Sequence, residues 1–571
     1  MFTSLPATVD DFQFWPWSQI EAYYQDLASR SLNSANVKEW LTDWSTIKEM
    51  VLETFNRLYV ANTCDTTDQE VEQRLLAFLE DIFPKSEAAD QILKEKLLES
   101  GLQPEGFEQQ LRNMRTEAAL FRPENLPLLA EERRLNSEYD KIIGAQTVQW
   151  EGKEITLPQL LPVYLDQDRQ KREQAWRLAS QRQLQDRPAI NDLWMKYMDL
   201  RRQLAQNAGE ENYRSYRWKQ LLRFDYTPAD CRALHQVVEE VVVPAANRIY
   251  EAHRQLMGLD SLRPWDMDHD RAVDPLGRPA LQPFETVAQL EEKAFIIFQR
   301  VDPQLGQHFD TMRRQNLLDL ENRKGKAPGG YCIDYPRARL PFIFMNSVGI
   351  HDDVQTILHE GGHAFHVFET GHLPYYHQRE AGIEFAEVAS TAMELLSAPY
   401  LTRQEGGFYS LEDTARARIE HLKSFILFWP YMTVVDAFQH WAYENPLLAS
   451  HPNNCDTKWT ELWQRFMPGV DWSGFEDVVA TGWQRKPHIH QAPFYYIEYG
   501  LAGLGAIQVW SNSLRDHPGA VRAYRKALSL GGTVPLPRLF ETAGASFSFS
   551  RRTIANAVKL LEDTISSLES L

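Results

Sequence analysis

Cysteine is scarce in this chain of 571 residues. Its four cysteines are Cys64, Cys231, Cys332 and Cys455, and none of them forms a Cys-x-x-Cys pair or a spacing typical of a disulfide framework. We therefore expect reduced thiols with a structural role rather than a set of cross-links.

Long apolar runs and excess basic charge are also missing. No apolar stretch approaches the length of a membrane span, and residues 1–11 lack a basic segment followed by an apolar run, so we expect no signal peptide. The net charge of −19 argues against nucleic acid or an anionic membrane as a partner. These absences predict a soluble, cytoplasmic protein and leave its oligomeric state open.

What is present is the composition and periodicity of a helical globular protein. Hydrophobic residues make up 43% of the chain and charged residues 24%. Apolar residues recur at helical spacing in 17–29, 37–59 and 67–81, and a long charged helix is predicted over 169–206. Alternation across a Gly turn predicts a small hairpin near 148–156, and 341–346 is predicted to be a short strand. We expect a mainly α-helical fold with a small β-sheet.

The most informative motif is His359-Glu360-Gly361-Gly362-His363. On a helix, positions i and i+4 lie on one face, so two imidazoles can hold one zinc ion and Glu360 can hold a metal-bound water. Asp352 and Asp353 precede the motif as capping carboxylates. The apolar residues that support a helix here are Val354, Ile357, Leu358 and Phe365. The alternative is a chance match, since the pattern is short.

A catalytic zinc needs a third protein ligand. A histidine in an HExxHxxGxxH pattern is excluded, because His366 and Glu369 stand where Gly and His are required. A following segment offers four carboxylates close to one helical face: Glu380, Glu384, Glu387 and Glu394. Their small, apolar neighbours indicate a buried helix, where an unpaired carboxylate is costly and a metal removes that cost. Periodicity alone does not separate Glu384 from Glu387.

Two strings carry a family resemblance. Leu358-His359-Glu360-Gly361-Gly362-His363 and Glu387-Val388-Ala389-Ser390-Thr391 resemble the M3 family of zinc metallopeptidases, in its oligoendopeptidase F branch. The resemblance implies one zinc ion per chain, held by His359, His363 and Glu387. It also implies that Glu394 supports the metal site without binding the metal.

The same resemblance implies an architecture. It is a zincin of the gluzincin type, a helical clamshell with a small β-sheet beside the active-site helix and a deep substrate channel. The expected domains are an N-terminal helical domain over 1–200 and a catalytic domain over 201–571.

One departure from the family pattern is the pair Gly361 and Gly362, where a bulky residue more often precedes the glycine. Two glycines weaken a helix interior by about 1 kcal/mol each relative to alanine. We expect them only if another backbone packs closely against this helix.

Residues 487–499 form a segment rich in histidine and tyrosine, bounded by prolines that suggest a loop. By resemblance, His488, Tyr495 and Tyr499 act in catalysis by donating hydrogen bonds to the oxyanion. His490 and Tyr496 match the family spacing less well and are assigned to substrate binding. The alternative is an aromatic core patch with exposed histidines.

Further substrate contacts are predicted in the strand that contains Phe344 and in a Gly-rich stretch that precedes it. Gly329, Gly330 and Tyr331 lie in a Gly-rich stretch that either closes over the site or forms a plain structural turn. Phe344 lies within 342–346, which is predicted to present a strand edge to an extended peptide.

The predicted function is zinc-dependent hydrolysis of internal bonds in oligopeptides, with Glu360 as general base. Two other readings stay open. One is a metal-free binding protein that retains the motif, and the other is an exopeptidase, which is less favoured because no GxMEN-like string is present.

Overall fold

The computed structural model describes residues 2, 5–267 and 274–570. It is mainly helical with two small sheets, which confirms the predicted fold class. The chain divides into two compact units, each discontinuous in sequence. The first comprises Met1–Ala118, Leu281–Thr414 and Ala502–Phe547, and the second comprises Ala119–Ala280, Ala415–Leu501 and Ser548–Leu571. The domain boundary predicted at residue 200 stays a prediction, because compact units need not coincide with sequence domains.

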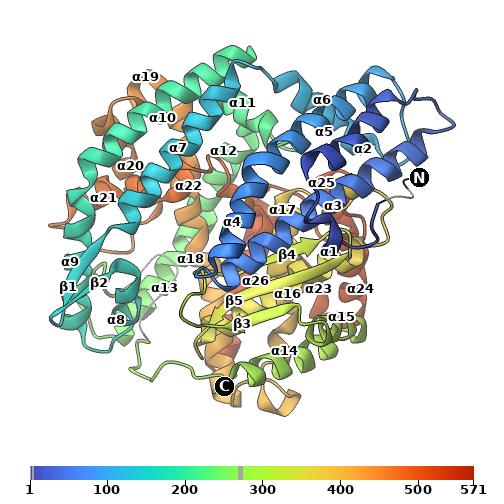
Figure 1. The fold of residues 1–571 in the computed structure, drawn as a ribbon. Helices are drawn as coiled ribbons and strands as arrows, with labels where there is room; N and C mark the ends of the chain where they lie inside the picture. Colours follow the sequence, from blue (N-terminus) through green and yellow to red (C-terminus); the bar gives the residue numbers. More distant parts are fainter. Residues whose placement is uncertain (1, 3–4, 268–273, 571) are drawn as a thin grey trace. The chain divides into compact units, whose positions relative to one another are not determined.

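The first unit contains a three-stranded sheet packed against helices (Figure 1). Its helices are α1 (Val9–Phe12), α2 (Trp17–Ser29), α3 (Val37–Cys64), α4 (Gln69–Ala77), α5 (Phe83–Glu99), α6 (Glu108–Leu120, to Ala118), α14 (Val287–Val301), α15 (Pro303–Arg314), α16 (His351–Thr370), α17 (Ile383–Ser397), the start of α18 (Leu411–Glu444, to Thr414), most of α23 (Ile497–Ser513, from Ala502 on), α24 (His517–Leu528) and α25 (Leu536–Thr542). Helix α2 has the predicted bounds, and α3 extends five residues beyond the predicted end at Tyr59. Trp40 and Trp44 of α3 are almost fully buried in the core of this region.

The sheet of the first unit has the order β3-β5-β4. Strand β3 (Leu318–Glu321) runs parallel to β5 (Leu340–Ser347), and β4 (Tyr331–Tyr335) runs antiparallel to β5. The strand predicted over 341–346 is therefore present, but the strand edge predicted for it is wrong. Strand β5 is central, with backbone partners on both sides, and β4 forms an outer edge of the sheet.

The second unit is built from helices and one hairpin. Its helices are α7 (Asn125–Gly144), α8 (Leu161–Tyr164), α9 (Arg169–Gln185), α10 (Arg187–Ala208), α11 (Tyr213–Gln220), α12 (Pro228–Val237), α13 (Val243–Leu256), α18 (Leu411–Glu444, from Ala415 on), α19 (Pro446–Ala449), α20 (Pro452–Phe466), α21 (Glu476–Ala480), α22 (Pro487–His490), α23 (Ile497–Ser513, to Leu501) and α26 (Arg551–Glu569). A π-helical turn, Val238–Val242, joins α12 to α13.

Two sequence predictions in the second unit have different outcomes. The hairpin is confirmed as β1 (Thr147–Trp150) and β2 (Lys153–Thr156), with Glu151 and Gly152 both at positive φ, as a tight hairpin turn requires. The prediction of one continuous helix over 169–206 is wrong in one respect, because the helix breaks at Asp186 into α9 and α10. Pro188 explains the break, since it lacks a backbone N–H and its ring clashes with the preceding turn.

In the part of the chain that the structure describes, no helix combines the length and apolar character needed to cross a bilayer.

Candidate metal centre

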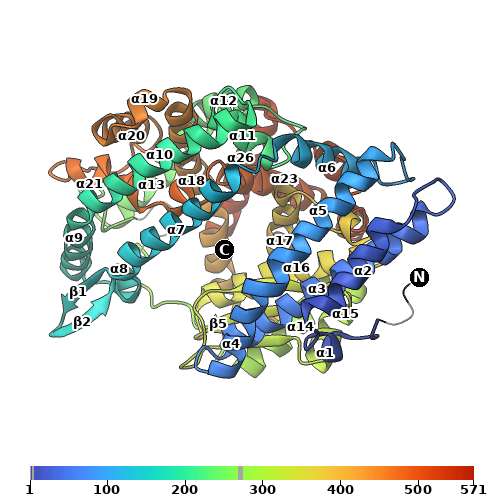
Figure 2. The same ribbon diagram turned by 45° about the horizontal axis from the view of Figure 1, so that its top comes forward.

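The HExxH motif lies in α16, which packs beside α17 and against the sheet of the first unit (Figure 2). Val354, Ile357, Leu358 and Phe365 are fully buried and account for the helical face predicted from their spacing. The helix begins after Ile350, and Asp353 accepts hydrogen bonds from the backbone N–H groups of Val348, Gly349 and Ile350. Asp353 is thus a capping carboxylate, although it stands in the first turn rather than at the N-cap.

The structure brings His359, His363 and Glu387 together. His359 Nε2 lies 3.4 Å from Glu387 Oε2, and His363 Nε2 lies 3.9 Å from the same oxygen. One ligand atom from each residue lies within 4.8 Å of the others. Two imidazoles and one carboxylate are a common protein set for a catalytic zinc, which keeps its fourth position open. The donor chemistry therefore fits the expected metal.

The other three glutamates of this segment take different positions. Glu380 precedes α17, and its carboxylate accepts a hydrogen bond from the Tyr376 hydroxyl. Glu384 lies in the first turn of α17, with its carboxylate close to Gly382. Glu394 Oε1 lies 2.7 Å from His359 Nδ1. Periodicity left Glu384 and Glu387 undecided, and the geometry favours Glu387 as the ligand.

The contact with Glu394 fixes the His359 ring. A proton on Nδ1 that is donated to this carboxylate leaves the Nε2 lone pair directed toward Glu387, where a metal ion would bind. Carboxylate partners of this kind orient metal-binding histidines and increase their basicity. The supporting role that the family resemblance implies for Glu394 stays a prediction, and the contact with His359 Nδ1 is the observation that favours it.

The charges of the cluster favour a cation. Burial lowers the pKa of His359, but the hydrogen bonds that its ring donates to the Glu387 and Glu394 carboxylates, with the negative charge of both, outweigh burial and raise the pKa well above its ordinary value. Burial lowers the pKa of His363 to about 4, and a positive charge on His359 adds to this effect. Glu387 is also buried, yet both histidines hold its pKa below the ordinary value. The two carboxylates thus stabilise positive charge where a metal would supply it.

Glu360 has the environment of a general base. Its side chain is buried, and burial raises its pKa to about 7, with His359 opposing the shift. The backbone N–H of Cys332 on β4 lowers the pKa by a smaller amount. A carboxylate poised near neutral pH can accept a proton from water and give it back.

Close packing against α17 explains Gly362, and close packing against Phe298 of α14 explains Gly361. A Cβ on Gly362 would lie 2.5 Å from Ala389 O and 2.5 Å from Ser390 Cα, and a Cβ on Gly361 would lie 2.4 Å from the Phe298 ring. No real Cβ tolerates such distances to backbone atoms. The expectation that another backbone approaches this helix is confirmed at Gly362 but not at Gly361, whose neighbour is a side chain.

The sequence analysis did not identify two residues that position helix α17 and the Glu387 carboxylate on it. Ser390 Oγ donates to the Glu387 carboxylate at 3.2 Å, and the Tyr524 hydroxyl donates to Ala389 O at 2.7 Å. Ser390 follows Glu387 by three residues, so helical spacing could have identified it. Tyr524 comes from α24, and no local signal in the sequence links it to α17.

The predicted His and Tyr segment belongs to the second unit, and part of it is helical rather than a loop. His488 lies in α22, and Tyr499 lies in the first turn of α23. The His488 ring centroid lies 5.9 Å from that of Tyr495, 4.9 Å from that of Tyr496 and 6.1 Å from that of Tyr499. These four rings form one group, while the Tyr496 hydroxyl accepts a hydrogen bond from Lys486.

His490 does not belong to this group. It is fully buried in an aromatic core, with its ring 4.5 Å from Tyr139, 5.7 Å from Trp194 and 5.8 Å from Trp483. Burial lowers its pKa to about 3. This position argues against the substrate contact predicted for His490.

The segment around Phe344 is a packed core rather than a binding surface. Phe344 is fully buried, and the Tyr331 ring stacks on it at 4.8 Å. Lys326 binds Asp319 and the carbonyl of Met345, while Asn346 donates to Gly329 O at 2.9 Å. These bonds anchor the Gly-rich stretch and favour the structural turn over a closing loop. Gly329 and Gly330 themselves are exposed.

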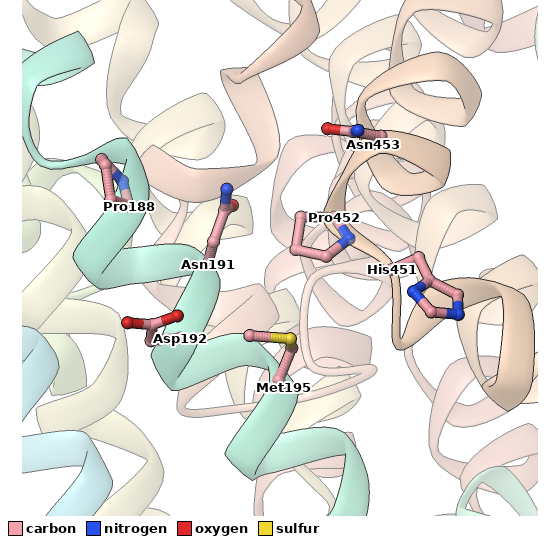
Figure 3. A pocket seen from close by; sticks show the side chains of 7 residues that line it. All are labelled: Pro188, Asn191, Asp192, Met195, His451, Pro452 and Asn453. Atoms are coloured by element: carbon pink, nitrogen blue, oxygen red, sulfur yellow. The ribbon is translucent and has the colours of Figure 1, made fainter.

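A separate surface hollow of about 380 Å³ lies between α10 and the start of α20. Figure 3 shows Met195 of α10 facing Pro452 and His451 across the hollow. The lining of this hollow includes none of the residues predicted for catalysis.

Comparisons with known proteins agree with the mainly helical fold and identify the family. Residues 164–557 match the model of peptidase family M3. Oligopeptidase PepF of Bacillus subtilis is 24% identical over 348 residues, which cover 58% of this chain and 47% of the relative. An oligoendopeptidase F homolog of Borreliella burgdorferi is 24% identical over 281 residues, covering 47% of this chain and 45% of the relative. The chain thus spans about half the length of the curated relatives it matches.

Solved structures match over nearly the whole chain. A structure of PZ peptidase A with an inhibitor is 27% identical, with a TM-score of 0.85 over 96% of this chain and 97% of that one. A structure provisionally described as oligoendopeptidase F is 27% identical, with a TM-score of 0.86 over 99% and 100%. Since the family model covers well over half of the sequence, the chain belongs to peptidase family M3, with relatives named oligoendopeptidase F.

Proposed function

We propose that this protein is a zinc-dependent endopeptidase that hydrolyses internal bonds of short oligopeptides. The observation that carries the proposal is the convergence of His359, His363 and Glu387 beside the buried carboxyl of Glu360. Membership of family M3 and similarity to relatives named as oligopeptidases support the substrate class.

The three ligands and Glu394 have separate tasks in this proposal. His359, His363 and Glu387 hold the ion, and Glu394 keeps the His359 ring oriented through Nδ1. Zinc, when bound, supplies a Lewis acid and lowers the pKa of a water molecule toward about 7.

Glu360 moves the proton. Its carboxylate accepts a proton from the attacking water and then returns it to the amine that leaves when the peptide C–N bond breaks. The pKa of about 7 that burial gives Glu360 suits both transfers near neutral pH. The N–H of Cys332 helps to hold the carboxylate in place.

We assign stabilisation of the oxyanion to His488, Tyr495 and Tyr499, on the family resemblance and on their grouping in one cluster. Burial, followed by the charge of Lys486, lowers the pKa of His488 to about 4. A neutral imidazole retains one N–H that can donate to the substrate. Tyr496, whose hydroxyl is bound by Lys486, supports the cluster rather than the substrate.

The substrate backbone is assigned to the outer edge of β4. An extended peptide can add to a sheet edge, and β5 has no free edge in this sheet. Asn56 already donates to Asp334 O at 2.8 Å, which limits pairing to the part of β4 that precedes Asp334. Gly329 and Gly330 lead directly into that part of the strand.

Two experiments test the proposal. Mass spectrometry of peptides blocked at both ends should show internal cleavage, whereas an exopeptidase leaves such peptides intact. Glu360→Ala should retain its zinc and lose about a hundredfold to ten-thousandfold in turnover, because it removes the base and not a ligand. Substantial activity in a zinc-loaded Glu360→Ala variant would remove Glu360 from this role. Absence of bound metal in active protein would favour a different chemistry altogether.

A further inference from the structure

A second cluster of metal-binding side chains lies inside the second unit, between α12 and α18. Cys231 and His235 stand one turn apart on α12, and Asp436 and His440 stand one turn apart on α18. All four are buried, with exposures of 0% for Cys231, 6% for His235, 0% for Asp436 and 3% for His440. Each pair has the i, i+4 spacing that places two side chains on one helical face.

The donor atoms of this cluster already lie close together. Cys231 Sγ, a carboxylate oxygen of Asp436 and a ring nitrogen of His440 lie within 4.8 Å of one another. His235 Nε2 lies 2.7 Å from Asp436 Oδ2, and His440 Nε2 lies 3.3 Å from the same oxygen. Thiolate, imidazole and carboxylate together are a set that binds zinc more readily than a hard cation such as magnesium.

Two buried atoms of the cluster lack a hydrogen-bond partner among the described residues. They are Asp436 Oδ1 and His440 Nε2; the latter lies 3.3 Å from Asp436 Oδ2 as an ion-pair contact that does not have hydrogen-bond geometry. Buried polar atoms are nearly always satisfied, so an unsatisfied pair within one cluster requires an explanation. A cation bound to both atoms provides one. A thiolate and a carboxylate also balance a divalent charge, which lets the ion be buried without net charge.

We propose that Cys231, Asp436, His440 and His235 form a second, structural zinc site that ties α12 to α18. The donor atoms of Cys231, Asp436 and His440 already lie close together. A shift of the His235 ring adds a fourth ligand and completes a tetrahedral coordination shell with no open position. The site has no catalytic role, because four protein ligands leave no position for water or substrate.

Metal binding requires three proton changes, and one of them moves the His235 proton now bound to Asp436 from Nε2 to Nδ1 when Nε2 becomes a ligand. Burial keeps the Cys231 thiol protonated by raising its pKa well above the ordinary value, so the thiol proton leaves to solvent as the S–metal bond forms. Coordination through His440 Nε2 places the remaining ring proton on Nδ1, which lies 3.4 Å from Arg214 Nη1. Arg214 must then give up its contact with His440 Nδ1, while the ion pair that the same Nη1 atom already forms with Glu444 can be kept.

Metal content of the full-length protein tests the proposal. Wild type loaded with zinc and dialysed should hold about two ions per chain, and His363→Ala and Cys231→Ser should each hold about one. Cys455→Ser is the matched control, since Cys455 is equally buried but donates to Ala449 O and belongs to neither cluster. It should hold both ions. A Cys231→Ser variant with wild-type zinc content would overturn the proposal.

Cobalt substitution separates the two sites by their ligands. Only the second site contains sulfur, so a thiolate-to-cobalt charge-transfer band should appear in wild type and in His363→Ala and be absent from Cys231→Ser. Should Cys231→Ser fail to fold, the wild-type spectrum decides alone. Lack of the sulfur band in cobalt-loaded wild type would mean that the cluster is a metal-free hydrogen-bonded network. The band in His363→Ala survives even if the catalytic proposal fails, so the two outcomes are distinguishable.

Discussion

Replacing Gly362 by alanine tests how closely the two ligand-bearing helices must pack. The added Cβ would lie 2.5 Å from Ala389 O and from Ser390 Cα, whereas ordinary contacts begin near 3.4 Å. Both neighbours are backbone atoms that cannot rotate away. We therefore expect α16 and α17 to move apart by about 1 Å, the distance needed to restore normal contact.

The expected loss of stability is modest. Overpacking of this kind costs about 1–3 kcal/mol. Alanine also improves helix propensity by about 1 kcal/mol over glycine. The net destabilisation is therefore about 0–2 kcal/mol, so the variant should fold.

The expected loss of function is larger. Glu387 lies on the same turn of α17 as Ser390, and metal–ligand distances tolerate changes of only about 0.2 Å. A shift of about 1 Å should lower kcat/KM by about a hundredfold. Competition with a chelator should report a matching fall in zinc affinity, while thermal unfolding shows only the small stability change.

The matched control is Gly144→Ala at the end of α7, where a Cβ meets nothing within 4 Å. It should leave zinc affinity and kcat/KM unchanged. If Gly362→Ala also shows wild-type zinc affinity and turnover, the reasoning that ties ligand geometry to close helix packing is refuted.

Three further variants test other parts of the account. Glu394→Gln should weaken zinc binding by about tenfold to a hundredfold, since it loses the charged partner of His359 Nδ1; an unchanged affinity in chelator competition would contradict this role. Tyr499→Phe should lower kcat by about tenfold to a thousandfold without changing zinc content, and an unchanged kcat would reduce Tyr499 to a packing residue. His490→Phe should make the protein less sensitive to acid. Burial lowers the pKa of His490 to about 3, so below pH 6.5 the unfolded chain takes up a proton that the folded chain excludes. The free energy of unfolding of the wild type therefore decreases as the pH is lowered. Between pH 6.5 and about pH 5, urea unfolding should show wild type losing about 2 kcal/mol more than this variant, whereas equal losses would contradict the burial argument.

Much of the metal centre could be predicted from local sequence. The i, i+4 histidines, the apolar spacing of α16 and the buried character of α17 all depend on short-range patterns. The choice between Glu384 and Glu387 could not be made in this way, because both lie near one helical face. It depends on where α17 begins and how it faces α16, which are tertiary properties.

The predictions for strand β5, for His490 and for the helix over 169–206 differ from the structure for specific reasons. The run from Phe342 to Met345 is continuously apolar, a pattern typical of a strand covered on both faces, and it was a signal against an exposed edge. The core around His490 is assembled from Tyr139, Trp194 and Trp483, which are distant in sequence. No local pattern distinguishes such a histidine from one that contacts substrate. The helix break at Asp186 could have been predicted from Pro188.

The central claim is that one zinc ion is shared by His359, His363 and Glu387. A crystal structure of the zinc-loaded protein with anomalous diffraction recorded at the zinc absorption edge measures this directly. The account predicts a strong anomalous peak within bonding distance of both Nε2 atoms and of the Glu387 carboxylate. A map without a peak there, or with Glu387 distant from both imidazoles, would contradict it.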